Sequence, residues 1–135
     1  PKRMVKDVCA LVRDHMYDVQ NQAKEDTLRL RFAAWGRERT MCQILLREAD
    51  IRGCGYNTGY VALRWRALFA CMLRDGTPFS ERELAVTGDE LKEVSGLPEG
   101  EALGALKREL YLHCVRHPQD NRRERLLHLA GNRKR

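Results

Sequence analysis

The feature that most constrains this chain is the dense turn chemistry of residues 79–104. Gly88 can take a positive φ at little cost, and Asp89 is a suitable N-cap for a short helical turn behind it. Gly96 stands where a helix C-cap usually lies, and Pro98 precedes a new helix with an acidic first turn. The pattern predicts a helix–turn–helix hinge, called the hinge segment below. Its structural residues are Thr87, Gly88, Asp89, Leu91, Gly96, Pro98, Gly100 and Gly104.

Apolar residues recur at helical spacing before the hinge segment. Helices are expected at about residues 4–16, at 28–35 with an end at Gly36, and at 37–51. The apolar stripe expected on the third helix is Met41, Ile44, Leu45, Glu48 and Ala49. A fourth helix is expected at about residues 57–74, and its expected buried residues are Val61, Trp65, Leu68, Phe69 and Met72.

A long helix is expected after the hinge segment, at residues 101–117, and a last one starts near residue 121. Only residues 84–86 have any strand character. The predicted class is therefore all-α, an array of six to seven helices in two lobes joined by the Gly/Pro-rich hinge. The predicted lobes are residues 1–76, and residues 77–135 including the hinge segment.

The net charge of +6 is unevenly distributed. Residues 1–76 carry 14 bases and 9 acids, residues 77–101 carry 2 bases and 7 acids, and residues 102–135 carry 9 bases and 3 acids. Two basic lobes that flank an acidic hinge suggest a polyanionic partner, and residues 132–135 form a basic tail. Nucleic acid is favoured over membrane, because no run of eighteen apolar residues and no evident amphipathic anchor helix is present.

The five cysteines are scattered and no pair has the C-x-x-C spacing, so neither a zinc site nor a disulfide framework is predicted. Reduced thiols and the lack of a signal peptide predict a cytoplasmic protein.

The sequence predicts no catalytic residue and no metal ligand. His113 and His117 have a spacing that can ligate a metal, but no third ligand plainly converges on them. The order in Asp14-His15 is the reverse of the His-Asp dipeptide of metal-dependent phosphohydrolases. The carboxylates of the hinge segment are explained by helix capping and a solvated face.

Basic side chains on the expected helices are better candidates for a site, because Lys and Arg can neutralise phosphates without reading bases. An ordinary solvated helix face explains the same pattern equally well. The predicted RNA-binding residues are Lys107, Arg108, Arg122, Arg123 and Arg125, followed by Arg64 and Arg66.

Three blocks of sequence carry a family resemblance. F-S-E-R-E-L-A-V-T-G-D-E-L at residues 79–91 resembles the D-L-x-x-x-G-K-D-L segment of bacterial CCA-adding enzymes (tRNA nucleotidyltransferases) and related poly(A) polymerases. G-L-P-E-G-E-A-L-G at residues 96–104 resembles that family's G-x-x-x-G-x-x-x-G, and N-R-R-E-R-L-L at residues 121–127 its N-x-x-E-x-L-L. Residues 11–15 and 46–50 resemble its L-V-x-x-H and L-x-x-A-D markers. In place of the family's usual Lys, this chain has Glu90.

The resemblance implies helical body and tail modules that grip the acceptor and TΨC arms of tRNA. It also implies that catalysis, with Mg²⁺ and CTP or ATP, belongs to an N-terminal head and neck of the same parent protein, whose motifs are not found in this sequence. The expected partners are tRNA and that head and neck, with no membrane partner and no cofactor in this chain. Two alternatives stay open, a degenerate metal-dependent phosphohydrolase and a helical oligomerisation module.

Overall fold

The computed structural model describes residues 1–55 and 59–132, and in these ranges it is all-helical, with seven α-helices and no strand. The predicted fold class is confirmed, and residues 84–86 form a bend rather than a strand. The basic tail at 133–135, the start of the fourth helix at residue 57 and the side chain of Val61 lie outside the described part of the chain. The chain divides into two compact units, Pro1–Cys71 (unit 1) and Met72–Arg135 (unit 2).

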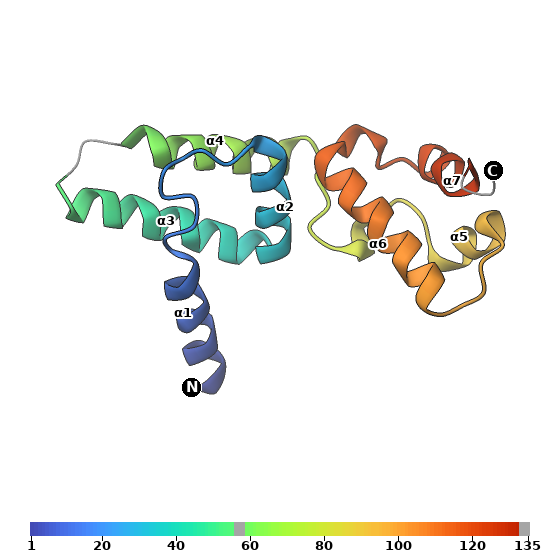
Figure 1. The fold of residues 1–135 in the computed structure, drawn as a ribbon, viewed down its shortest axis with the longest axis horizontal. Helices are drawn as coiled ribbons and strands as arrows, with labels where there is room; N and C mark the ends of the chain where they lie inside the picture. Colours follow the sequence, from blue (N-terminus) through green and yellow to red (C-terminus); the bar gives the residue numbers. More distant parts are fainter. Residues whose placement is uncertain (56–58, 133–135) are drawn as a thin grey trace. The chain divides into compact units, whose positions relative to one another are not determined.

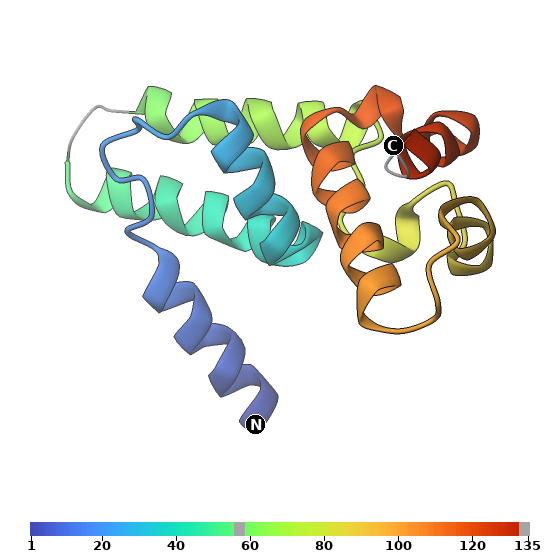
Figure 2. The ribbon, with the colours of Figure 1, turned by 45° about the vertical axis from the view of Figure 1, so that its right-hand side comes forward.

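Unit 1 contains α1 (Lys2–Asp14), α2 (Glu25–Trp35), α3 (Arg37–Gly53) and most of α4 (Gly59–Arg74). Gly36 ends α2 and begins α3 with a φ of 84°, and its N–H donates to Phe32 O at 3.0 Å. Since a φ in this region suits glycine best, the sharp turn between the two helices was readable from the sequence. Figures 1 and 2 both show α1 running away from the group formed by α2, α3 and α4.

The core of unit 1 is aromatic. Phe32 from α2 and Trp65 from α4 are almost completely buried, and their rings meet edge to face with centroids 5.3 Å apart. Phe69 and Trp35 also pack against Phe32. Each such buried side chain contributes roughly 2–3 kcal/mol through removal of apolar surface from water.

The buried face of α3 differs from the predicted apolar stripe. Met41 and Leu45 are 38% and 50% exposed, whereas Gln43 and Arg47 are at most 6% exposed. Ile44 is buried as predicted, but Met41 and Leu45 are not, because the rest of the buried face packs on backbone: Gln43 Nε2 donates to Leu11 O at 3.1 Å, and Arg47 reaches the loop after α1. Buried carbonyls need donors, so polar side chains replace apolar ones here.

Unit 2 contains the 3₁₀ helix η1 (Glu81–Glu83), α5 (Gly88–Ser95), α6 (Glu101–Arg116), the 3₁₀ helix η2 (Pro118–Asp120) and α7 (Arg123–Gly131). α5 packs against both α6 and α7. The apolar side chains buried in unit 2 include Leu84, Val86, Leu91, Leu106, Leu110, Cys114, Val115 and Leu126. The hinge segment lies wholly inside unit 2, so it is not itself the connection between the two units.

Within the hinge segment, the N-cap of α5 is Thr87 rather than Asp89. The Thr87 hydroxyl accepts from Glu90 N at 3.3 Å, and the Glu90 carboxylate accepts from Thr87 N at 2.8 Å, forming a capping box. Asp89 lies in the first turn of the helix, and Gly88 is its first residue without a positive φ. At the other end, Gly96 is confirmed as the left-handed C-cap, with φ 67°.

The two later glycines of the segment have different roles. Gly100 is the N-cap of α6 with φ 136°, a backbone conformation that side chains rarely adopt. Gly104 lies inside α6, and a Cβ added there would meet open space. Only the first of these glycines is required by backbone geometry.

Candidate nucleic-acid interface

Three of the predicted RNA-binding arginines are exposed in unit 2 and already contact carboxylates. Arg123 Nε lies 2.6 Å from Glu90 Oε1, and Arg108 Nη1 lies 3.4 Å from Glu81 Oε1. Arg125 Nε lies 3.4 Å from a carboxylate oxygen of η2. These solvent-exposed pairs are weak, and a phosphate oxygen can replace the carboxylate oxygen in each of them.

The Arg123–Glu90 pair connects the predicted cationic helix to the capping box of α5. The pKa of Glu90 is lowered, first by the hydrogen bond from Thr87 N and then by the hydrogen bond from Arg123. Glu90 is therefore a fixed anion that both caps α5 and orients Arg123.

Lys107 and Arg122 differ from these arginines, because neither has an ion-pair partner in the part of the chain that the structure describes. Lys107 is half-buried on α6, and Arg122 is exposed at the N-cap of α7. Other exposed cations of unit 2 share this property although the sequence did not single them out: Arg74 at the end of α4, Arg82 in η1 and Arg116 near the end of α6 lack a carboxylate partner among the described residues. Their local sequence did not distinguish them, because Arg82 stands between Glu81 and Glu83, and Asp120 follows Arg116 by four residues.

Arg64 and Arg66, the remaining predicted RNA-binding residues, lie in unit 1. Arg64 donates to Asn21 O and Asn21 Oδ1 at 3.3 and 3.0 Å and also to Ala23 O, so its guanidinium holds the loop between α1 and α2. Arg66 makes two hydrogen bonds of 2.8 Å to the carboxylate of Glu48. Both have intramolecular roles, and Arg66 is the more exposed of the two.

The loop that Arg64 holds has a second arginine anchor, which sequence reasoning missed. Arg47 donates to Tyr17 O and Asp18 O at 2.7 Å, and its guanidinium carbon lies 4.2 Å from the ring centroid of Trp65. Burial lowers the pKa of Arg47. Thr40, Gln43, Ile44 and Arg47 recur at helical spacing. This pattern was the available signal in the sequence that α3 buries a face with polar side chains.

Histidines and carboxylates gather at one further place, the junction of α6 and η2. His113 Nε2 lies 2.7 Å from Asp120 Oδ2, and the rings of His113 and His117 are 4.8 Å apart. The hydrogen bond from His113, followed by the charge of Arg125, lowers the pKa of Asp120. The described residues hold no group of three or more His, Cys, Asp or Glu side chains suited to a metal ion.

The dipeptide Asp14-His15, considered above for a phosphohydrolase site, is also engaged locally. Asp14 accepts from Arg39, and His15 Nδ1 contacts Val12 O. Its two side chains therefore fasten the end of α1.

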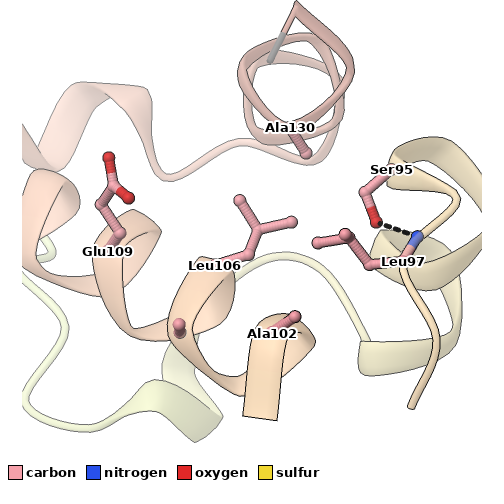
Figure 3. A pocket seen from close by; sticks show the side chains of 7 residues that line it. Ser95, Leu97, Ala102, Leu106, Glu109 and Ala130 are labelled. Atoms are coloured by element: carbon pink, nitrogen blue, oxygen red, sulfur yellow. Dashed lines mark hydrogen bonds between the residues drawn. The ribbon is translucent and has the colours of Figure 1, made fainter. Parts of the chain in front are cut away.

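A small hollow with a mostly apolar lining lies between α5, α6 and α7, with a volume of about 220 Å³. Figure 3 shows Leu97, Leu106 and Ala130 around it, with Glu109 at one side and the Ser95 hydroxyl bonded to Leu97 N. This bond is 3.2 Å long, so the Ser95 hydroxyl serves the turn after α5. The residues lining the hollow are Ser95, Leu97, Ala102, Ala105, Leu106, Glu109 and Ala130.

None of the helices in the described ranges is long and apolar enough to cross a bilayer. No protein-family model, no curated protein and no solved structure matches this chain.

Proposed function

We propose that this chain is the tRNA-binding body and tail portion of a tRNA nucleotidyltransferase, of the CCA-adding or the poly(A) polymerase type. In this role it positions the acceptor and TΨC arms by phosphate and shape contacts, and a catalytic head elsewhere in the parent protein adds nucleotides to the 3′ end. The head would supply the Mg²⁺ site and bind CTP or ATP. As a part of tRNA processing, the protein would act in the cytoplasm.

The observation that carries the proposal is the placement of Lys107 and Arg122. Both lie on the helices that follow the hinge segment, and neither is neutralised by an acid among the described residues. An uncompensated cation beside phosphate releases counterions and adds affinity without reading the base sequence. The rigid framework behind them supports the same reading, because the motif blocks at residues 79–91 and 96–104 form the caps of α5 and α6.

Asn121, the first residue of the third motif block, holds the chain just before Arg122. Its side chain accepts from Ala85 N at 2.9 Å and donates to Glu83 O at 3.0 Å. The two hydrogen bonds fix the start of α7 against the segment between η1 and α5. Arg122, the next residue, is thereby held in one place, as recognition by shape requires.

The charge balance of the units sets the expected strength of binding. Unit 2 has 12 bases and 11 acids, a net charge of +1, whereas unit 1 has 13 bases and 8 acids, a net charge of +5. Affinity in unit 2 must therefore depend on local cations rather than on net charge. Removal of two phosphate contacts should reduce the salt slope of binding by about two.

The test is a fluorescence-anisotropy titration of labelled tRNA at about 50 mM and about 200 mM salt, with duplex DNA as competitor. Lys107→Glu/Arg122→Glu should lower the affinity at the lower salt concentration about tenfold or more and flatten the salt dependence. Lys92→Glu is the control for Lys107→Glu and Arg122→Glu taken singly, because each changes the net charge by the same amount and Lys92 lies in the acidic hinge segment on α5, where it contacts Glu99 at 3.9 Å. Circular dichroism verifies that each variant is folded. Binding without salt dependence, without preference for tRNA, or with equal losses in the control and the single variants would refute the proposal.

A further inference from the structure

α1 presents an apolar face that none of the described residues of unit 1 covers. It is the one α-helix of the described residues for which the structure buries no side chain. Met4, Val5, Val8 and Val12 are 70%, 61%, 51% and 57% exposed. A contiguous patch of this kind marks an interaction site in a folded protein.

The contacts that hold α1 leave this face open. Arg39 Nη2 donates to Ala10 O at 3.2 Å and also contacts Asp14, and Gln43 donates to Leu11 O. All three contacts are made by the C-terminal half of the helix. Figures 1 and 2 show the N-terminal half clear of α2 and α3. A helix of 13 residues with so little packing is marginal in water unless a partner covers its apolar side.

The spacing of the valines indicates what kind of partner fits. Val5, Val8 and Val12 are separated by three and four residues, the repeat of helices that pair along a seam. Val5 and Val12 take the first heptad position and Val8 the fourth. Val8 at the fourth position departs from the leucine that completes the two-stranded pattern, so the stripe by itself indicates a self-associating seam.

The charges beside the stripe favour a parallel arrangement. At 3.6 residues per turn, Lys2, Lys6 and Arg13 lie along one edge of the stripe and Asp7 lies toward the other, whereas Asp14 contacts Arg39 of α3. In a parallel pair with two-fold symmetry, the basic edge of each helix faces the acidic edge of its mate. In an antiparallel pair, like edges meet and repel.

We propose that α1 is a homodimerisation helix, whose valine stripe pairs in parallel with α1 of a second copy of this chain. The exposed patch covers roughly 400–600 Å² in each copy, so the pair would bury roughly 800–1,200 Å². This is the weak end of specific interfaces, and dissociation constants between about 10 µM and 1 mM are expected. Asp7 already contacts Arg3, and Arg13 already contacts Asp14 at 3.5 Å, so the charged edges select the orientation more than they add affinity. The proposal is independent of any role in RNA binding.

The first test is sedimentation equilibrium of the whole chain from about 10 µM to about 1 mM. The expected result is a reversible monomer–dimer equilibrium, and Val8→Glu should raise its dissociation constant at least tenfold. Leu63→Glu is the matched control, because Leu63 is 61% exposed on α4 and should leave the equilibrium unchanged. A monomer throughout this range, or equal behaviour of the two variants, overturns the proposal.

The second test concerns orientation, in a background where the exposed Cys9, Cys42 and Cys54 are replaced by Ser. Val5→Cys alone, on mild oxidation, should give a disulfide-linked dimer, since equivalent residues face each other only in a parallel pair. An antiparallel pair would link Val5→Cys only to Val12→Cys in a mixture, and that outcome refutes the parallel geometry. Vesicles of phosphatidylcholine and phosphatidylglycerol test the alternative that a lipid surface covers the valine stripe. Binding to them that Val8→Glu abolishes, with a monomer in solution, would assign the face to lipid instead.

Discussion

Replacement of Arg47 tests whether the polar buried face of α3 stabilises unit 1. Arg47 is 6% exposed and donates to the carbonyl oxygens of Tyr17 and Asp18, each at 2.7 Å. Arg47→Met keeps most of the apolar stem but removes both donors, so it leaves two carbonyls without these partners. Arg47→Lys keeps the charge, but one ammonium group cannot reproduce the forked geometry of the guanidinium.

The expected magnitude follows from these contacts. Each hydrogen bond from a charged donor contributes about 1.5–3 kcal/mol, and the contact with the Trp65 ring adds about 0.5–2 kcal/mol. Burial of the guanidinium, which lowers the pKa of Arg47, offsets part of this sum. Arg47→Met should therefore lower the free energy of unfolding by about 2–4 kcal/mol, and Arg47→Lys by about 1–2 kcal/mol. A unit of this size has a total stability of only about 4–10 kcal/mol.

Urea unfolding followed by tryptophan fluorescence measures this effect in unit 1 alone, because both tryptophans, Trp35 and Trp65, lie in residues 1–71. Arg52→Met is the control, because Arg52 is exposed on the same helix, and it should change the stability by about 0.5 kcal/mol or less. If Arg47→Met and Arg52→Met unfold at the same urea concentration, the buried arginine does not anchor the loop and the reasoning fails.

Two further predictions concern unit 2. Gly100→Ala should destabilise it by about 1 kcal/mol, because φ at this residue is 136°. Gly104→Ala, inside α6 where an added Cβ meets open space, should stabilise it by up to about 1 kcal/mol. Thermal unfolding followed by circular dichroism should show shifts of the melting temperature in opposite directions, and equal shifts would contradict the assignment. The pKa of Asp120 is lowered, first by the hydrogen bond from His113. The ionised carboxylate therefore stabilises unit 2 at pH values above its ordinary pKa of 3.8, and this stabilisation is lost as the pH falls through the lower native pKa. Asp120→Asn should remove this acid-dependent loss from the stability profile, and a profile identical to that of the unchanged protein would show that the contact has no energetic effect.

Prediction from the sequence succeeded where the determining interactions are local. The turn at Gly36, the C-cap at Gly96 and the helix that begins at Glu101 depend on residues only a few positions apart. Helical periodicity likewise identified the buried positions Trp65, Phe69 and Met72 on α4. The predicted N-cap of α5, Asp89, lies two positions after the observed one, Thr87. The sequence could not separate them, because both side chains can cap a helix.

The candidate site was predictable only in part. Helical spacing placed the basic residues on α6 and α7, but it could not show which of them contact acids. Arg123 lies 33 residues from Glu90, and Arg108 lies 27 residues from Glu81. Such pairs form only when the chain has folded, so the distinction between paired and unpaired cations depends on packing.

By itself, the sequence determined an all-helical chain with its main helix ends and turns, because capping, glycine conformation and the 3.6-residue period operate over one or two turns. The tertiary structure alone decided that α3 buries Gln43 and Arg47 rather than Met41 and Leu45, and that the valines of α1 remain exposed. These outcomes depend on which surfaces meet. Buried carbonyl oxygens of a distant loop required donors on α3, and an apolar helix face with no surface opposite it stays in water.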